Sequence, residues 1–164
     1  MRHGILICLM LATTSVFGTS AGNDTAFVRI FEHYEAIRQV LIEDSTDGVA
    51  SHAEAIADIA RELKLEFSAP DAQVSVGDAA KVRPLLPEIS EKATRVASAS
   101  DLASVRGELA ELTKPLVRWH ELVEGSRPVV AYCPMEKKAW LQPDEAIGNP
   151  YAPYMLRCGE VVQR

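Results

Sequence analysis

Apolar residues recur at every third or fourth position through most of the first 125 residues, which is the spacing of one face of an α-helix. Asp24 is the predicted N-cap of the first such stretch, and polar, turn-forming clusters separate the stretches. The pattern predicts amphipathic helices that pack as an antiparallel four-helix bundle. The expected helices cover residues 24–41, 49–63, 87–96 and 102–123, and residues 68–84 are predicted to be a connection.

The helical pattern ends near Gly125, and a different kind of chain follows it. Residues 126–164 are rich in proline, carry two cysteines and show no helical period. Two short runs, 128–132 and 160–162, are predicted to pair as a short β-hairpin that closes an irregular loop. The expected fold class is therefore mainly α. A helical bundle over residues 22–125 carries an irregular, Cys-bearing C-terminal cap over residues 126–164, packed on the bundle as part of one domain.

The first 21 residues have the parts of a secretory signal peptide. A positively charged start is followed by the apolar stretch Ile5–Phe17 and then by the small residues Thr19-Ser20-Ala21. The stretch is shorter than the roughly 20 apolar residues that a membrane span needs. We therefore expect cleavage after Ala21 and a periplasmic mature chain without a membrane span.

Charge and motif content argue against two classes of function. The chain has 17 basic and 23 acidic residues, a net charge of −6, and such a field repels phosphate backbones, so no nucleic-acid partner is expected. The sequence lacks a phosphate-binding glycine loop, a Gly-x-Ser-x-Gly elbow and a His-Glu-x-x-His pair. We therefore expect no enzymatic activity.

The remaining candidate chemistry lies in sulfur side chains of the cap. Met135 follows Cys133 by two residues and Met155 precedes Cys158 by three, so each pair can share one face of its segment. If the flanking strands pair, the four sulfur atoms can converge. Thiolate and thioether ligands favour monovalent copper or silver over zinc, magnesium or calcium. These four residues are therefore the predicted metal ligands.

The two cysteines have a second interpretation, which stays open at this level. An exported cysteine pair commonly forms a disulfide, and a Cys133–Cys158 bond would contribute about 3 to 3.5 kcal/mol in the chain-entropy model. Met135 and Met155 would then be packing residues, which is the usual role of methionine. The two interpretations are compatible if oxidation controls metal loading.

Histidines and aromatic residues complete the list of candidates. His120 lies nearest in sequence to Cys133 and is the first choice for a further metal ligand, ahead of His33 and His52 at the margins of their apolar stripes. Trp140 and Tyr151 are expected to be apolar anchors that pack the cap onto the helices.

Several short motifs of the cap occur in one order along the chain. They are Tyr132-Cys133-Pro134-Met135, Ala139-Trp140-Leu141, Ile147, Asn149-Pro150-Tyr151, Met155-Leu156 and Cys158-Gly159-Glu160-Val161. In these motifs the chain resembles a bacterial domain of unknown function. That domain occurs alone in exported proteins and fused to the periplasmic adaptor, or membrane-fusion, subunits of copper/silver-type efflux systems. Cys-Pro-Met is also similar to the opening of small heavy-metal-binding domains in copper pumps, where a histidine generally follows, whereas Glu136 follows here.

Two hypotheses follow. The first is a periplasmic accessory protein of metal efflux or homeostasis that binds copper(I) or silver(I). In this hypothesis the metal ion is held by the four sulfur residues with His120, and the resemblance implies an efflux adaptor or another periplasmic metal carrier as partner. The second is a structural or interaction module of the bacterial envelope, closed by a Cys133–Cys158 disulfide and without a metal role.

Overall fold

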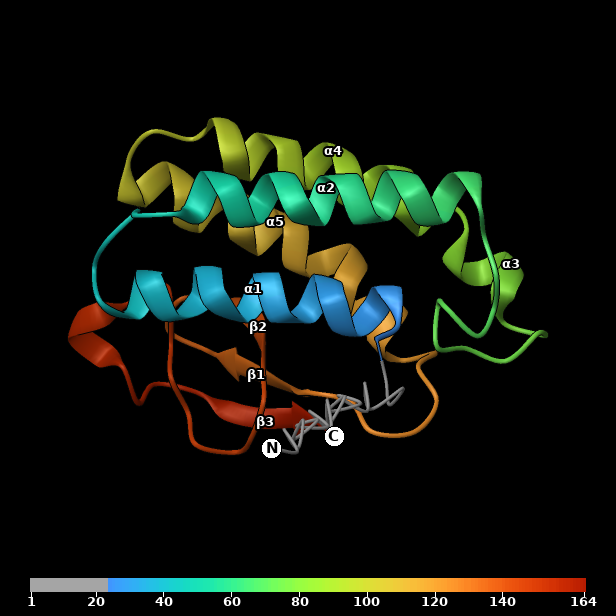
Figure 1. Cartoon of the computed structure of the whole chain (residues 1–164). Coiled ribbons are helices and arrows are strands. Elements are labelled where there is room, and N and C mark those ends of the chain that lie inside the picture. Colours follow the sequence, from blue (N-terminus) through green and yellow to red (C-terminus); the bar gives the residue numbers. More distant parts are fainter. Residues whose placement is uncertain (1–23) are drawn as a thin grey trace, which may run out of the picture.

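The structure is a computed structural model that describes residues 24–164, so the predicted signal peptide lies outside the described residues. Within this range the chain forms four long helices, one short helix and a three-stranded antiparallel sheet (Figure 1). The helices are α1 (Ala26–Ile42), α2 (Val49–Leu65), the short α3 (Ala79–Val82), α4 (Leu85–Ser98) and α5 (Leu102–His120). The strands are β1 (Val129–Cys133), β2 (Lys138–Gln142) and β3 (Glu160–Gln163), with the 3-10 helix η1 (Pro153–Met155) before β3.

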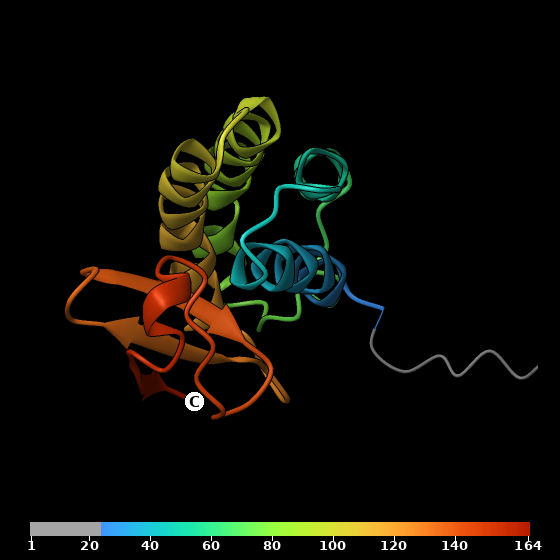
Figure 2. The ribbon, with the colours of Figure 1, turned by 90° about the vertical axis from the view of Figure 1, so that its left-hand side faces the viewer.

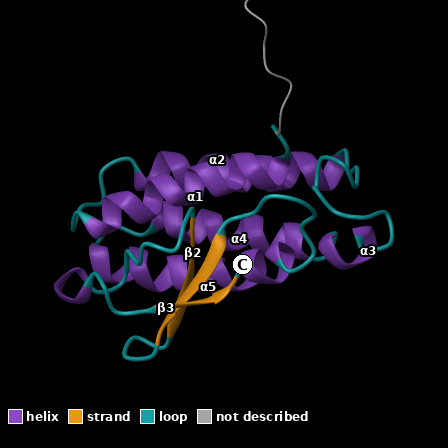
Figure 3. Ribbon diagram, turned by 90° about the horizontal axis from the view of Figure 1, so that it is seen from below, coloured by secondary structure: helices purple, strands orange, loops and turns teal. Residues whose placement is uncertain are grey.

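The long helices pack in chain order, α1 against α2, α2 against α4 and α4 against α5. Figure 2 views the helices nearly end-on, with the sheet on one side of the helical layer. β2 contacts α5 and α1, and the strands run across the helix axes when the molecule is seen from below (Figure 3). The prediction of a mainly helical fold is confirmed, whereas the antiparallel four-helix bundle stays a prediction.

Aromatic side chains fill the space between α1 and α5. Phe27 on α1 meets Trp119 on α5 edge to face, with ring centroids 5.3 Å apart, and both are buried. Trp119 Nε1 donates a hydrogen bond of 3.0 Å to the carbonyl of Ala72, so the connection between α2 and α4 is tied to the same core. The apolar cluster continues into the cap, where it includes the two predicted anchors, Trp140 and Tyr151.

The helix ends follow their capping residues. The side chain of Thr25, not the predicted Asp24, caps α1 by accepting from the amide of Val28 at 3.3 Å. Asp101 caps α5 in the same way through the amide of Ser104 at 2.9 Å. The third long helix was expected to begin at Pro87 but begins at Leu85. The proline is accommodated inside the helix because it lies in the first turn, where the amide hydrogens have no helical acceptor and a missing one breaks no bond.

The sheet confirms one predicted pairing and adds a strand. β1 pairs with β3, with Tyr132 opposite Glu160, as the two short runs predicted. β1 also pairs with β2, so β1 is the central strand. Strand β2 was not predicted, because it is short and its last three residues are all buried, which removes the alternation that marks a half-buried strand.

The connection between α2 and α4 is more ordered than the sequence pattern indicated. It contains the four-residue helix α3, which is too short to show a helical period. Val74 forms an isolated bridge with Val123, and the Gln73 side chain donates to the carbonyl of Glu124 at 2.8 Å. The connection therefore packs against the end of α5.

Among the described helices, none has the length and apolar character required to cross a membrane.

Gly107 lies on the exposed side of α5, and a Cβ atom placed there would meet no other atom within 4 Å. Glycine in a helix interior is less favourable than alanine by roughly 0.5–1 kcal/mol because its unfolded backbone has more freedom. We expect Gly107→Ala to raise the free energy of unfolding by about that amount in urea denaturation. Ala103→Gly, at another exposed position of α5, is the matched reverse change and should lower it similarly. A loss of stability in Gly107→Ala would show that the space around the Cβ position of Gly107 is not open.

Candidate functional site

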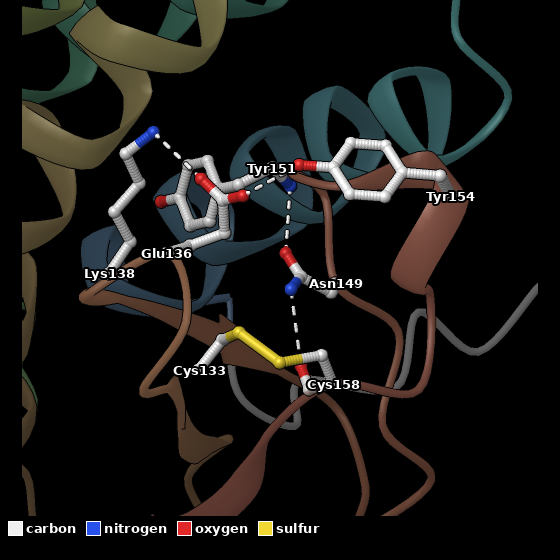
Figure 4. Close-up of a disulfide and its surroundings, with 7 residues drawn as sticks. All are labelled: Cys133, Glu136, Lys138, Asn149, Tyr151, Tyr154 and Cys158. Atoms are coloured by element: carbon white, nitrogen blue, oxygen red, sulfur yellow. Dashed lines mark hydrogen bonds and ion pairs between the residues drawn. A yellow bond between two sulfur atoms is a disulfide. The ribbon is translucent and has the colours of Figure 1, made fainter.

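Cys133 and Cys158 form a disulfide at one end of the sheet (Figure 4). Cys133 is the last residue of β1 and is fully buried, while Cys158 precedes β3 and is half-buried. The pairing of Tyr132 with Glu160 brings the two cysteines together, with their Cα atoms 5.6 Å apart. Of the two interpretations of the cysteine pair, the disulfide is the one that the structure contains.

The two methionines differ in their surroundings. Met135 lies in the turn between β1 and β2, and 72% of its surface is exposed. Met155 ends η1, is half-buried, and its carbonyl accepts the amide of Cys158 at 2.8 Å, so these two residues share one turn. Because both cysteines of the cap are in the disulfide, the thioethers are the soft donors that remain among residues 126–164 in this oxidation state. The structure thus joins the two cysteines and places Met155 beside one of them.

His120 lies away from the disulfide. Its side chain is buried, and Nε2 is 2.7 Å from the carbonyl oxygen of Pro128, just before β1. Cys133 is at the other end of that strand, so the two residues are separated by about 15 Å of extended chain. Nδ1 has no hydrogen-bond partner among residues 24–164, and burial lowers the pKa of His120. The structure therefore gives His120 a packing position at the end of α5. No group of three or more His, Cys, Asp or Glu side chains in the described chain is arranged to hold a metal ion.

Two arginines hold the irregular part of the cap against the helices. Arg38 on α1 is paired with Glu35 at 2.6 Å, and its Nη1 donates to the carbonyl of Gly148 at 2.6 Å. Arg106 on α5 donates from Nε to the carbonyl of Pro150 at 2.9 Å. Hydrogen bonds from charged donors are stronger than neutral ones, and these reach backbone atoms of the loop. Helix side chains thus position the loop that lies between β2 and η1.

Asn149 organises the loop next to the disulfide (Figure 4). The side chain is fully buried, and its Nδ2 donates to the carbonyl of Cys158 at 3.1 Å. Its Oδ1 accepts from the amide of Tyr151 at 2.9 Å. Asn149 belongs to the motif Asn149-Pro150-Tyr151, but no positioning role was predicted for its side chain. The Asn149-Pro150 dipeptide is a turn signal that marks such a position.

A buried chain of hydroxyl groups joins the cap to two helices. Tyr34 on α1 and Thr113 on α5 are within 2.7 Å of each other through their hydroxyl oxygens, and Tyr151 of the cap lies 3.4 Å from Thr113. The Tyr151 hydroxyl donates to the carbonyl of Ala139 at 2.9 Å. Burial raises the pKa of both tyrosines, that of Tyr151 well above 10. These hydroxyls are therefore neutral hydrogen-bonding groups that fix the position of the cap.

A groove of about 700 Å³ lies between α5 and the β1–β2 hairpin. One wall is the face of α5 that carries Gly107, Ala110 and Lys114, and the opposite wall includes Tyr132 and Lys137 of the hairpin. The groove could not be predicted from the sequence, because its two walls come from segments that only the tertiary fold brings together. The available signal was the pair of small residues Gly107 and Ala110 on one side of a long helix.

No protein-family model matches the chain, and comparisons with curated proteins and with solved structures also give no match.

His33 on α1 and His52 on α2 form a pair distant in sequence from the cap. Their Nδ1 atoms are 3.0 Å apart and their ring centroids 5.3 Å apart, so the two nitrogens face each other and share one hydrogen. Burial, followed by the charge of His52, lowers the pKa of His33, although Glu32 acts in the opposite direction. Protonation of both rings would place two N–H groups and two positive charges against each other.

This pair predicts a pH dependence of stability. The pKa of His33 in the folded protein is below its ordinary value of 6.5, so below that pH the unfolded chain binds more protons than the folded chain. The stability that the neutral pair contributes is present above pH 6.5 and is lost as the pH falls towards the lowered pKa. We expect the melting temperature of wild type to fall from about pH 7 to about pH 5.5 more steeply than that of His33→Gln or His52→Gln. All three proteins retain His120, so the difference between them isolates the pair. Identical slopes would contradict the prediction.

Proposed function

We propose that this protein is a disulfide-closed interaction module of the bacterial envelope. In this proposal the four long helices act as an antiparallel bundle and support the C-terminal cap, which carries the binding surface. The observation that carries the proposal is the disulfide between Cys133 and Cys158. Disulfides form and persist mainly in oxidising compartments, which agrees with export by the predicted signal peptide.

The construction of the cap supports a binding role. Between β2 and β3 the only regular element is the short η1, yet the loop is held by Arg38, Arg106 and the buried Asn149. A loop fixed in one conformation loses little entropy when a partner binds, so its affinity for that partner is higher. The resemblance to domains fused to efflux adaptors leads us to propose an envelope assembly as the partner.

The oxidation state of the cysteines in the exported protein tests this proposal. The chain is expressed with its N-terminal segment, recovered from the periplasm without reductant, and its mass is measured with a thiol-alkylating reagent present. We expect a mass two hydrogens below that of the dithiol and no alkylation. The matched control is the same protein after reduction, which should gain two alkyl groups. Free thiols in the exported protein would overturn the proposal.

Binding of copper(I) or silver(I) by the reduced cap is the second candidate function. The closeness of Cys133 and Cys158, together with the position of Met155 in the same turn as Cys158, supports it. Reduction of the disulfide by two electrons and two protons, from a thiol reductant, yields two thiols that can bind one ion as thiolates. Such a site would release its ion on oxidation, so metal binding would depend on the redox state.

Anaerobic titration with copper(I) tests the second candidate. The reduced protein should bind one equivalent, the oxidised protein none, and the reduced Cys133→Ala/Cys158→Ala variant none. Met155→Leu keeps the volume and apolar character of the side chain and should weaken binding by about tenfold if the thioether is a ligand. Equal binding by the reduced wild type and the double-alanine variant would exclude a site at the two cysteines.

A further inference from the structure

The groove between α5 and the β1–β2 hairpin has the size of a small-molecule site. Its volume of about 700 Å³ lies within the usual range for such sites. The groove is lined by α5 on one side and by the β1–β2 hairpin on the other. The ribbons of these two elements lie next to each other in Figure 2. On α5 the groove reaches from Gly107 to Arg118, which corresponds to about 16 Å of helix. This shape suits an extended chain better than a compact ring.

The wall formed by α5 carries small and apolar residues between charged ones. Gly107, Ala110 and Val117 lie on one side of the helix, and no atom lies within 4 Å of the Cβ position of Gly107. A glycine inside a long helix lowers its stability, and a larger residue at this position would occupy the space above the helix. On the hairpin side, Tyr132 and Ala139 continue the apolar lining. The groove is therefore an apolar site that is open to solvent.

The charges around this apolar floor are mainly positive, although the whole chain is acidic. The lining contains four cations and two carboxylates, whereas the net charge of the chain is −6; the charged lining residues are Lys114, Arg118, Lys137, Lys138, Glu111 and Glu136. Glu111 pairs with Lys114, and Glu136 pairs with Lys138 at 3.6 Å. Lys137 in the hairpin turn forms no ion pair within residues 24–164 and is exposed. One unpaired cation beside an elongated apolar floor matches a ligand with one anionic group and an alkyl chain.

We propose that this groove binds a free fatty carboxylate, with the alkyl chain along α5 over Gly107 and Ala110 and the carboxylate at Lys137. This inference deepens the proposed function, because it rests on the cap as a binding surface and names the class of ligand. The chain contacts the apolar lining, and the unpaired lysine favours an ionised headgroup over a neutral one.

Displacement of a fluorescent amphiphile tests the inference with the whole oxidised protein. Anilinonaphthalene sulfonate is bound first at neutral pH. Dodecanoate is then added below its micellar concentration, or dodecanol below its solubility limit. We expect dodecanoate to displace the dye and dodecanol, with the same chain but no charge, to do so with at least tenfold lower affinity. Equal displacement by both, or displacement by neither, would overturn the inference.

Two variants with matched controls locate the site. Gly107→Leu fills the groove and should weaken dodecanoate binding by at least tenfold, whereas Ala103→Leu, on the same helix but outside the groove lining, should not change it. Lys137→Glu should weaken dodecanoate binding by about fivefold and leave dodecanol unchanged, while Lys64→Glu, exposed on α2, should change neither. Circular dichroism confirms that each variant is folded, and the two variants act through volume and charge independently.

The outcomes separate this inference from the proposed function. Dodecanoate binding that neither Gly107→Leu nor Lys137→Glu weakens would overturn the groove as the site. A concentration-dependent dimer that excludes the dye would also overturn it, because a second copy of the chain would then occupy the groove. The alkylation experiment is independent of the ligand, so a protein with an intact disulfide and no dodecanoate binding would lose only the ligand assignment.

Discussion

Replacement of both Cys133 and Cys158 by alanine is expected to lower the free energy of unfolding by about 3.5 kcal/mol, because the disulfide closes a loop with a sequence separation of 25 residues. In the chain-entropy model the bond acts mainly by restricting the unfolded chain. For a domain of this size the loss corresponds to a fall in melting temperature of roughly 10 °C. Alanine is used because Cys133 is fully buried, and a serine there would bury an additional hydroxyl group.

Calorimetry of the oxidised protein, the reduced protein and the Cys133→Ala/Cys158→Ala variant measures this effect. The variant should melt near the reduced wild type, and reductant should shift the wild type but not the variant. A variant as stable as the oxidised protein would show that the loop is held without the bond.

The loss should be concentrated in the cap. β3 is an edge strand of four residues with no buried side chain, so the disulfide next to it supplies a large part of its attachment. In the variant, amide hydrogen exchange should increase over residues 143–163 more than in α2 or α4, which pack mainly against other helices. Uniform protection across the chain would contradict a local role of the bond.

Gly159→Ala is expected to destabilise the protein by about 3 kcal/mol, for two physical reasons. The backbone of Gly159 has a φ of +148°, which side chains of L-residues rarely adopt. In addition, an added Cβ would lie 2.6 Å from Cη2 of Trp140, a fully buried ring whose Nε1 donates to Gln142 at 2.7 Å. The ring is held on its polar side and packed on its apolar side, so it has little room to move.

Urea denaturation of two further variants separates these reasons. Gly125 also has a positive φ, +79°, but a Cβ there would meet no atom within 4 Å, so Gly125→Ala should show only the smaller conformational cost of about 1 kcal/mol. Trp140→Phe removes the part of the ring that the new Cβ would meet, so Gly159→Ala should cost less in that background than in wild type. Additive losses in the double variant would rule out the contact with Trp140 as the cause.

The helices and part of the sheet could be predicted from the sequence because both depend on local patterns. Apolar spacing and the polar clusters between the apolar stretches identified the long helices, since residues three or four apart share a helix face regardless of the rest of the fold. The pairing of β1 with β3 was likewise predicted from two short apolar runs. Strand β2 and helix α3 were missed because both are short and neither has a clear period.

The candidate site could be predicted only in part. The sequence identified four important residues of the cap, Cys133, Cys158, Trp140 and Tyr151. In a proline-rich loop, cysteines were expected to bind metal or form a disulfide, and large aromatic residues to pack the loop onto the helices. It did not predict the roles of Arg38 and Arg106. Arg38 donates to a carbonyl that lies 110 positions later in the chain, and Arg106 to one that lies 44 positions later. Contacts at such separations depend on how the helices pack and leave no periodic signal.

The amino-acid sequence by itself determined the helical segments, the change of character after Gly125, and the residues from which a sulfur site or a disulfide can be built. Only the tertiary structure decided that the two cysteines are joined in one bond, because the β1–β3 pairing places them side by side, and that His120 lies at the far end of β1. The groove is also a product of the tertiary structure, since α5 and the hairpin meet only when the cap packs on the helices. The physical reason is common to both: a local pattern specifies which face of an element is apolar, but the distance between two elements depends on everything packed between them.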